Sequence, residues 1–436
     1  MTFFARRFFF HGTFSLLLLK AIYQITYIIF TLLVVKQLSV DSYGAYSYIL
    51  ALIVYFSSIP LLGLPTYLQK CLAKDGAFNK KYFLFPLFAT FLGVVFVSQL
   101  MDANTLFEKI AVVIIILFNS LMIITVSITD GLGRYTFQYY FLLINSLWML
   151  YCLLKVFVFH QIIHLDTILS CWLINILLSS FLIIPLLFKL LHRRIQAPEI
   201  DPSSSFIFTD LLLFSAVTIP DAFARFYDKF LAHKYLGDQF LGQYSFNLML
   251  VLTIYALFIR PINSILFTQL AKHHYSPIQS YRTVKVYYQF GFIVYWGFFF
   301  CYWLGNNYFL RLGGMTKYQD SMDLFFFCFI NGLLYFIALP FMILITLSDN
   351  RYKKIVYCIA SLLVFNIPLI CLILSNSKVS FCIGFTLAYL LNAALSVYLE
   401  YMMVNEFIRM VYLEMRQSFN KIRDRWYGAE GSRLNK

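Results

Sequence analysis

The apolar stretch TDLLLFSAVTIPDAFARFYDKFLAH, at 209–233, carries Asp210 near its start and four more charged residues in its second half. These four are Asp221, Arg225, Asp228 and Lys229. Their spacing of i, i+4, i+7 and i+8 places all four on one face of a helix. The arginine could bind an anion through two parallel hydrogen bonds, while an acid exchanges a proton or a sodium ion. The same spacing also lets acids and bases pair and neutralise the helix, so both interpretations stay open.

The helices that hold these charges are predicted to cross a membrane. The 436 residues are 61% hydrophobic and only 12% charged, and a soluble domain carries roughly twice that charged fraction. Uncharged runs at 83–101 and 356–374 are long enough to span about 30 Å of hydrocarbon as helices. Twelve spans are predicted, at 12–35, 43–66, 82–101, 109–128, 137–159, 167–188, 207–231, 242–270, 286–305, 321–347, 355–375 and 379–403. The first is expected to be retained, because it contains no small-residue cleavage site.

The basic residues of the connecting loops predict the orientation of these spans. Loops on one side, including both termini, hold 23 Lys and Arg residues, whereas the opposite loops hold six. Basic residues near span ends stay in the cytoplasm, so both termini are predicted to be cytoplasmic. This excess accounts for most of the net charge of +14, and nucleic acid is therefore not an expected partner. The tail, 404–436, mixes basic and apolar residues and is expected to lie on the anionic inner leaflet.

Five basic residues remain inside the predicted spans, and each needs a physical reason. They are Lys20, Lys155, Arg225, Lys229 and Arg260. A basic residue at mid-helix costs roughly 2.5–3.5 kcal/mol. Lys155 and Lys229 lie near outer span ends, where snorkelling to the headgroups is the simpler interpretation. Lys20 and Arg260 lie roughly 12 and 15 Å from the cytoplasmic face, at a helical rise of 1.5 Å per residue. Pro261, directly after Arg260, is expected to bend its helix.

Two segments of the chain are nearly the same. Gly44 and Gly242 are 198 residues apart, and the stretches around them, DSYGAYSYILAL and QFLGQYSFNLML, align without a gap. Identical residues at this offset include Lys36 and Lys234, Tyr46 and Tyr244, Ser47 and Ser245, and the LAK tripeptides at 72–74 and 270–272. Six spans precede the polar linker and six follow it, so both halves have the same orientation. This pattern is typical of a duplicated transporter whose halves rock around a central site.

The predicted fold is therefore an all-α polytopic membrane protein. Twelve transmembrane helices form two parallel-repeat six-helix bundles around a central cavity. The expected organisation is an N-terminal bundle at 1–192, a cytoplasmic linker at 193–206, a C-terminal bundle at 207–403 and the basic amphipathic tail at 404–436.

The duplicated segments also resemble a known family. The stretch at 38–74 carries L-x-x-x-x-Y-G, then a span, then L-G-L, as at the start of Wzx-type polysaccharide flippases. Those flippases belong to the multidrug/oligosaccharidyl-lipid/polysaccharide (MOP) exporter superfamily. The stretch DKFLAHKYLGDQFLGQYSF, at 228–246, is similar to the family's seventh span. The resemblance covers both halves of the chain, while the aromatic content of 20% is unusual for the family.

The resemblance implies an activity and a set of partners. It implies export of undecaprenyl-diphosphate-linked oligosaccharide across the bacterial inner membrane for O-antigen or related surface polysaccharide, with membrane lipids and polysaccharide polymerase proteins as further partners. In the family, spans 1 and 8 carry basic residues near the diphosphate, and Lys20 and Arg260 match these by span and depth. Together with Arg225 and Lys229, they form the predicted diphosphate site. Asp221 and Asp228 are candidates for H⁺ or Na⁺ coupling or for charge pairing. Residues that could contact sugars are Asn119, Asn145, Asn175, Asn331 and Tyr335.

Other kinds of site are not predicted. The 8 cysteines show no paired spacing, so neither a disulfide framework nor a metal site is expected. The chain contains no G-x-x-x-x-G-K-[ST] loop and hence no expected ATP site. No cofactor and no catalytic residue are predicted.

Two alternatives remain open. A polysaccharide polymerase or ligase is also a many-span protein, but it carries a large outward loop, and the longest one here, 306–320, is short. A cation-coupled drug antiporter of the same superfamily favours acids in its cavity, whereas the deepest charges here are mostly basic.

Overall fold

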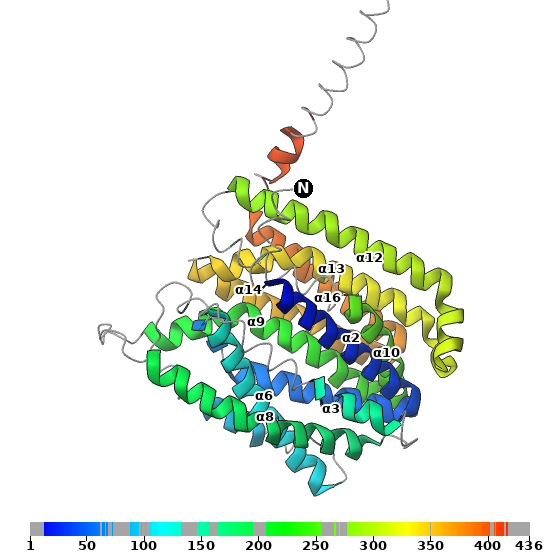
Figure 1. Ribbon diagram of the computed structural model, residues 1–436. Helices are drawn as coiled ribbons and strands as arrows, with labels where there is room; N and C mark the ends of the chain where they lie inside the picture. The colour runs from blue at the N-terminus through cyan, green and yellow to red at the C-terminus, as the bar shows by residue number, and fades with distance from the viewer. Residues whose placement is uncertain are drawn as a thin grey trace, which may run out of the picture.

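The structure of the chain is a computed structural model. It describes residues 13–61, 63–65, 67–68, 72, 88–95, 97, 101, 105–131, 146–147, 149–156, 164–194, 206–254, 266, 270, 277–348, 350–401, 405, 407–413 and 416. Within these residues every regular element is a helix, and Figure 1 shows the long helices lying side by side. We refer to residues up to 192 as the N-terminal half and residues from 207 as the C-terminal half.

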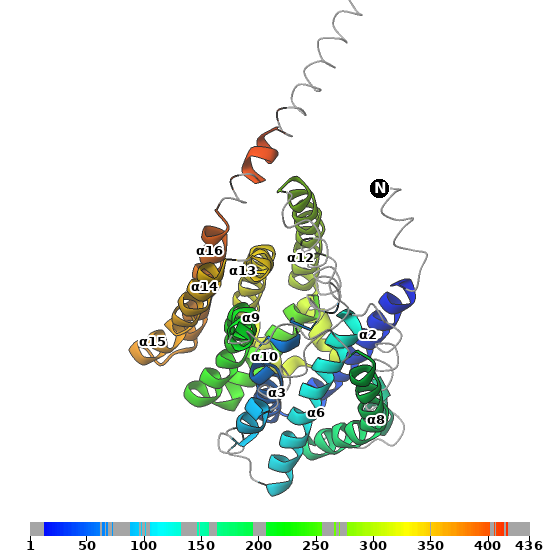
Figure 2. The same cartoon turned by 90° about the vertical axis from the view of Figure 1, so that its left-hand side faces the viewer.

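The helices divide between the two halves of the chain. Those of the N-terminal half are α2 (Thr13–Gln37), α3 (Val40–Ser58), η1 (Ile59–Leu61), α6 (Leu106–Gly131) and α8 (Leu165–Arg194). Those of the C-terminal half are α9 (Phe206–Leu231), η2 (Ala232–Leu236), α10 (Gly237–Ile254), α12 (Pro277–Gly313), η4 (Thr316–Ser321), α13 (Met322–Leu347), α14 (Arg351–Val364), α15 (Ile367–Leu374) and α16 (Lys378–Leu399). Figure 2 shows α14, α15 and α16 on one side of the molecule and α2 and α8 on the other, with α3 and α10 between them.

Several of these helices are long and apolar enough to cross a membrane. Five meet this condition by length and composition: Val40–Leu61, Leu106–Thr129, Thr316–Leu347, Arg351–Leu374 and Lys378–Leu399. Large apolar side chains are exposed on their surfaces and on α12, as expected for a protein that faces lipid. The chain is therefore a multi-pass membrane protein. The number twelve stays a prediction, because 82–101, 137–159 and the second part of 242–270 lie partly outside the described residues.

The predicted span at 355–375 is not one continuous helix. The chain breaks between α14 and α15, at Phe365 and Asn366. Pro368 has no backbone N–H and cannot continue the hydrogen-bond ladder to Val364. The side chain of Asn366 bonds back to the carbonyl of Leu362 at 2.7 Å and helps to satisfy the end of α14.

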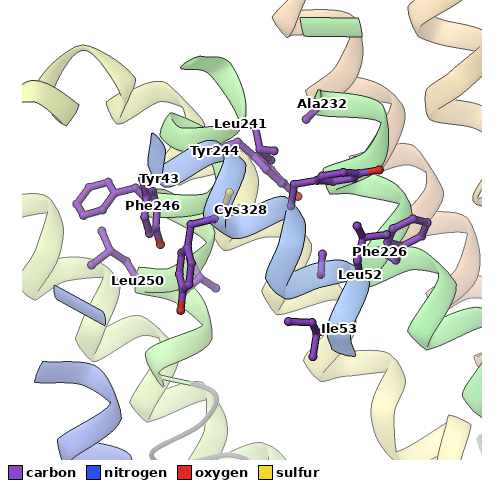
Figure 3. Packing of buried hydrophobic residues seen from close by; sticks show 14 of the residues in the cluster. Tyr43, Leu52, Ile53, Phe226, Ala232, Leu241, Tyr244, Phe246, Leu250 and Cys328 are labelled. Carbon is purple, nitrogen blue, oxygen red and sulfur yellow. The ribbon is translucent and has the colours of Figure 1, made fainter. Parts of the chain in front are cut away.

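The start of α3 is defined by its own polar side chains. Ser39 accepts a hydrogen bond from the backbone N–H of Ser42 at 3.1 Å, and Asp41 follows in the first turn. Such capping and an early acid stabilise a helix N-terminus. The helix then lies between α9 and α10. In Figure 3, Tyr43 lies beside Phe246 of α10, and Leu52 lies on the opposite side beside Phe226 of α9.

Candidate functional site

Helix α9 carries the four charged residues singled out above, and Pro220 lies inside it. The first two form a two-point ion pair one helical turn apart. Nε of Arg225 donates to Asp221 at 3.2 Å, and Nη2 lies 3.1 Å from the second carboxylate oxygen. This pair is accessible, with side-chain exposures of 45% for Arg225 and 26% for Asp221. An accessible two-point pair of this kind can exchange its carboxylate for another oxyanion.

Arg225 also reaches a second helix. Its Nη2 donates to the hydroxyl of Tyr335, on α13, at 2.8 Å, and its guanidinium carbon lies 5.2 Å from the centroid of the Tyr335 ring. The guanidinium is therefore oriented by one acid and one phenol from different helices. Such two-sided orientation reduces the freedom that an arginine loses when it binds a ligand.

The second pair, Asp228 and Lys229, is buried. Asp228 is only 3% exposed, and its Oδ1 accepts from the backbone N–H of Lys229 at 2.7 Å and from Nζ at 3.2 Å. Its Oδ2 accepts from the hydroxyl of Tyr244, on α10, at 2.8 Å. Lys229 Nζ also donates to the carbonyl of Arg225 at 3.0 Å. A buried carboxylate needs such partners, because an isolated one would cost several kcal/mol.

Further polar residues lie on the helices that pack against α9 and were not singled out from the sequence. Ser361 on α14 donates to Asn392 on α16 at 2.6 Å, and the Asn392 amide bonds to the Tyr357 hydroxyl at 3.3 Å. The i, i+4 spacing of Tyr357 and Ser361 is the sequence signal that could have identified this cluster.

The remaining predicted residues are placed only in part. Lys20 lies in α2, but its side chain is outside the described residues, as is all of Arg260. That Lys20 and Arg260 belong to one site therefore stays a prediction. Lys155 lies 5.0 Å from the centroid of the Tyr151 ring, and the helical segment at 149–156 contains both. Asn331 is buried on α13, and its side-chain oxygen has no hydrogen-bond partner in the described part of the chain.

The pairing of Asp221 with Arg225 and of Asp228 with Lys229 makes these four charges of α9 neutral as a set. Each acid contacts a base of the same helix, which is the neutralising arrangement that the spacing allows. The two pairs nevertheless differ, because one is accessible and extends to α13, and the other is buried and extends to α10. Among the described residues, no group of three or more His, Cys, Asp or Glu side chains could hold a metal ion.

Comparisons with known proteins agree with a transporter architecture. No protein-family profile and no curated protein matches the chain by sequence. Solved structures that are similar include an inward-facing multidrug resistance MATE family transporter of the MOP superfamily, at a TM-score of 0.58 and 12% identity over 88% of this chain and 95% of that one. A MATE in complex with MaL6 has a TM-score of 0.59 and 11% identity over 90% of this chain and 95% of that one.

The outward-facing conformation of a multidrug resistance MATE family transporter is also similar, at a TM-score of 0.54 and 11% identity over 90% of this chain and 96% of that one. All of these neighbours are transporters rather than enzymes. The chain has the helical fold of these MATE family transporters.

Proposed function

We propose that the chain is a flippase that moves undecaprenyl-diphosphate-linked oligosaccharide from the inner to the outer leaflet of the bacterial inner membrane. The observation that carries the proposal is the accessible Arg225, which is held by Asp221 and Tyr335 within an exporter fold. A basic residue at membrane depth points to function by default, and the resemblance of 38–74 and 228–246 to Wzx-type flippases supplies the substrate class.

Arg225 would bind the diphosphate by exchanging one anionic partner for another. A diphosphate carries about two negative charges and several acceptor oxygens, and it can replace the Asp221 carboxylate in the same two-point geometry. Lys20, Arg260 and Lys229 complete the proposed cationic site. Aromatic and amide side chains around α9, such as Tyr335, are suited to sugars.

Alternating access would expose this site to each side in turn. The N-terminal half, 1–192, and the C-terminal half, 207–403, are the proposed moving bodies. Both termini would be cytoplasmic, as the distribution of basic residues in the loops indicates.

The membrane potential is the proposed driving force. Outward movement of two negative charges down an inside-negative potential yields roughly 4.6 kcal/mol per 100 mV. The measurement is the rate at which the lipid-linked oligosaccharide is flipped in proteoliposomes under an imposed voltage. A rate that ignores voltage but follows a pH or sodium gradient would instead assign coupling to Asp221 or Asp228.

The test of function is complementation of a deletion strain, scored as surface polysaccharide at matched expression. We expect severe loss with Arg260→Ala and Arg225→Ala, and a milder loss with Lys155→Ala, because Lys155 lies near a predicted span end and over the Tyr151 ring. Normal polysaccharide in the deletion strain itself contradicts the proposed substrate. A stronger effect of Lys155→Ala than of Arg260→Ala contradicts the proposed site.

A cation-coupled drug antiporter is the second candidate. The similar solved structures include multidrug resistance transporters, and the two acids of α9 could take part in ion exchange. For this function, the deletion strain becomes sensitive to cationic drugs while its surface polysaccharide stays normal. The same strain therefore distinguishes the two candidates.

A further inference from the structure

The two glycines of the repeat meet each other in space. A Cβ atom placed on Gly44 would lie 2.9 Å from the carbonyl carbon of Asp238 and nearer still to its oxygen. One placed on Gly242 would lie 2.9 Å from the carbonyl carbon of Val40, and again nearer to the oxygen. Real Cβ atoms essentially never approach other atoms so closely, so each position requires glycine.

The contact is reciprocal in the way that a twofold axis requires. Asp238 and Val40 are separated by the same 198 residues as the two glycines. Each glycine therefore lies against the equivalent carbonyl of the other copy, as in an isologous interface between two subunits. Here the interface joins α3 to α10, and hence one half of the chain to the other.

The crossing lies within the first two turns of both helices, at the end predicted to face outside. Other contacts between the halves surround it. Lys317 of η4 donates to the carbonyl of Lys36 at 3.1 Å and also to that of Leu38, at the C-terminal end of α2. Further along α3, the ring of Tyr48 stacks on His233 at 4.3 Å.

This junction combines a close fit with weak individual bonds. Backbones that touch through glycine leave no gap between the two helices at that point, and such close approach favours dispersion and Cα–H···O contacts. The nearby hydrogen bond between His233 Nδ1 and Asp238, at 2.6 Å, stays within the C-terminal half. Separation of α3 from α10 at the glycines therefore breaks no ion pair between these two helices in the described part of the chain.

We propose that Gly44 and Gly242 form a latch that closes the outer side of the molecule and that parts when this side opens. The latch consists of bare backbone, so it seals by shape, and its release also frees Lys317 from the carbonyls of Lys36 and Leu38. Its role in transport rests on the proposed function, but its opening can be measured on the purified chain without any substrate.

The first experiment compares Gly44→Ala and Gly242→Ala with Gly297→Ala, whose added Cβ meets nothing within 4 Å. Alanine normally stabilises a helix relative to glycine, so Gly297→Ala is expected to keep or raise the melting temperature. The two latch variants are expected to lower it, each by about 5 °C or more. Melting temperatures that match Gly297→Ala for either latch variant would overturn the contact.

The second experiment does not depend on how the alanine variants fold. Spin labels at Asp41→Cys and Gln239→Cys, two exposed positions related by the repeat, report the separation of the outer ends. The background has its native cysteines replaced and retains the parent's melting temperature. We expect a short and a long distance population in nanodiscs, with the long one enriched several-fold by Gly44→Ala. A single short population at every pH from 5 to 8 would show that the crossing is static and that the latch is wrong.

Discussion

The two copies of the repeat share a contact but differ in chemistry. Gly44 and Gly242 make equivalent contacts in α3 and α10. The same offset of 198 residues, carried back into α2 and α9, places Phe30 at the position of Asp228 and Thr31 at that of Lys229. Phe30 is fully buried. The first copy therefore has a buried aromatic ring at the position where the second copy has a carboxylate.

The two positions also share one contact with the backbone. Thr31 donates to the carbonyl of Tyr27 at 2.8 Å, and Lys229 donates to the carbonyl of Arg225 at 3.0 Å, each reaching back four residues. The backbone interaction is thus kept while the side chain changes. The difference teaches that the helix crossing needs only glycine, whereas the charged pairs of α9 are specific to the second copy.

The largest expected effect comes from placing the acid in the other copy. Phe30→Asp buries a carboxylate without its ammonium, which costs several kcal/mol, so the purified protein should melt far below the parent or fail to fold. Phe30→Asp with Thr31→Lys should recover part of that loss. The measurement is thermal unfolding in detergent, with Phe30→Leu as the control for volume. If Phe30→Asp alone is as stable as the parent, the two copies are not equivalent at this position.

The next largest loss of stability is expected from removing Asp228, the acid of the second copy. Asp228→Ala leaves Lys229 without its carboxylate and should destabilise by about 3–5 kcal/mol. The double variant Asp228→Ala with Lys229→Ala should be less destabilised than the two single effects predict, because neither residue then lacks a partner. Additive losses in this thermal double-mutant cycle would indicate that the pair contributes nothing as a pair.

The two repeat tyrosines offer a matched comparison of smaller size. Tyr244→Phe removes a hydrogen bond to a buried carboxylate, a loss of roughly 1.5–3 kcal/mol. Tyr46→Phe should cost less, because Phe30 stands where the acid would be. Chemical or thermal unfolding of both variants measures the difference. Equal losses would contradict the assignment of the Tyr244 bond to Asp228.

The smallest effect on stability is expected from Asp221→Asn. Its pair with Arg225 is accessible, and exposed pairs contribute roughly 0.2–1 kcal/mol, so the melting temperature should stay close to the parent's. If Asp221 competes with the substrate for Arg225, the variant should bind anionic lipid headgroups more tightly in a vesicle flotation assay. A large loss of stability would instead make this pair structural.

Part of this architecture could be predicted from the sequence alone. The repeat around Gly44 and Gly242 and the common face of the α9 charges depend on spacing along the chain, which the sequence contains. The bonds from Asp228 to Tyr244 and from Arg225 to Tyr335 depend on which helices pack together, and spacing does not define that. The break before Pro368 was missed because the surrounding run is uniformly apolar, although proline is the physical cause.

The reciprocity of the glycine crossing bears on how the two copies could diverge. In a half-length chain that associates with itself, any substitution changes both sides of an isologous interface at once. After fusion into one polypeptide, each side can change alone. A buried acid and its ammonium can then be gained by one copy while the other keeps its aromatic ring, with the shared crossing still holding them together.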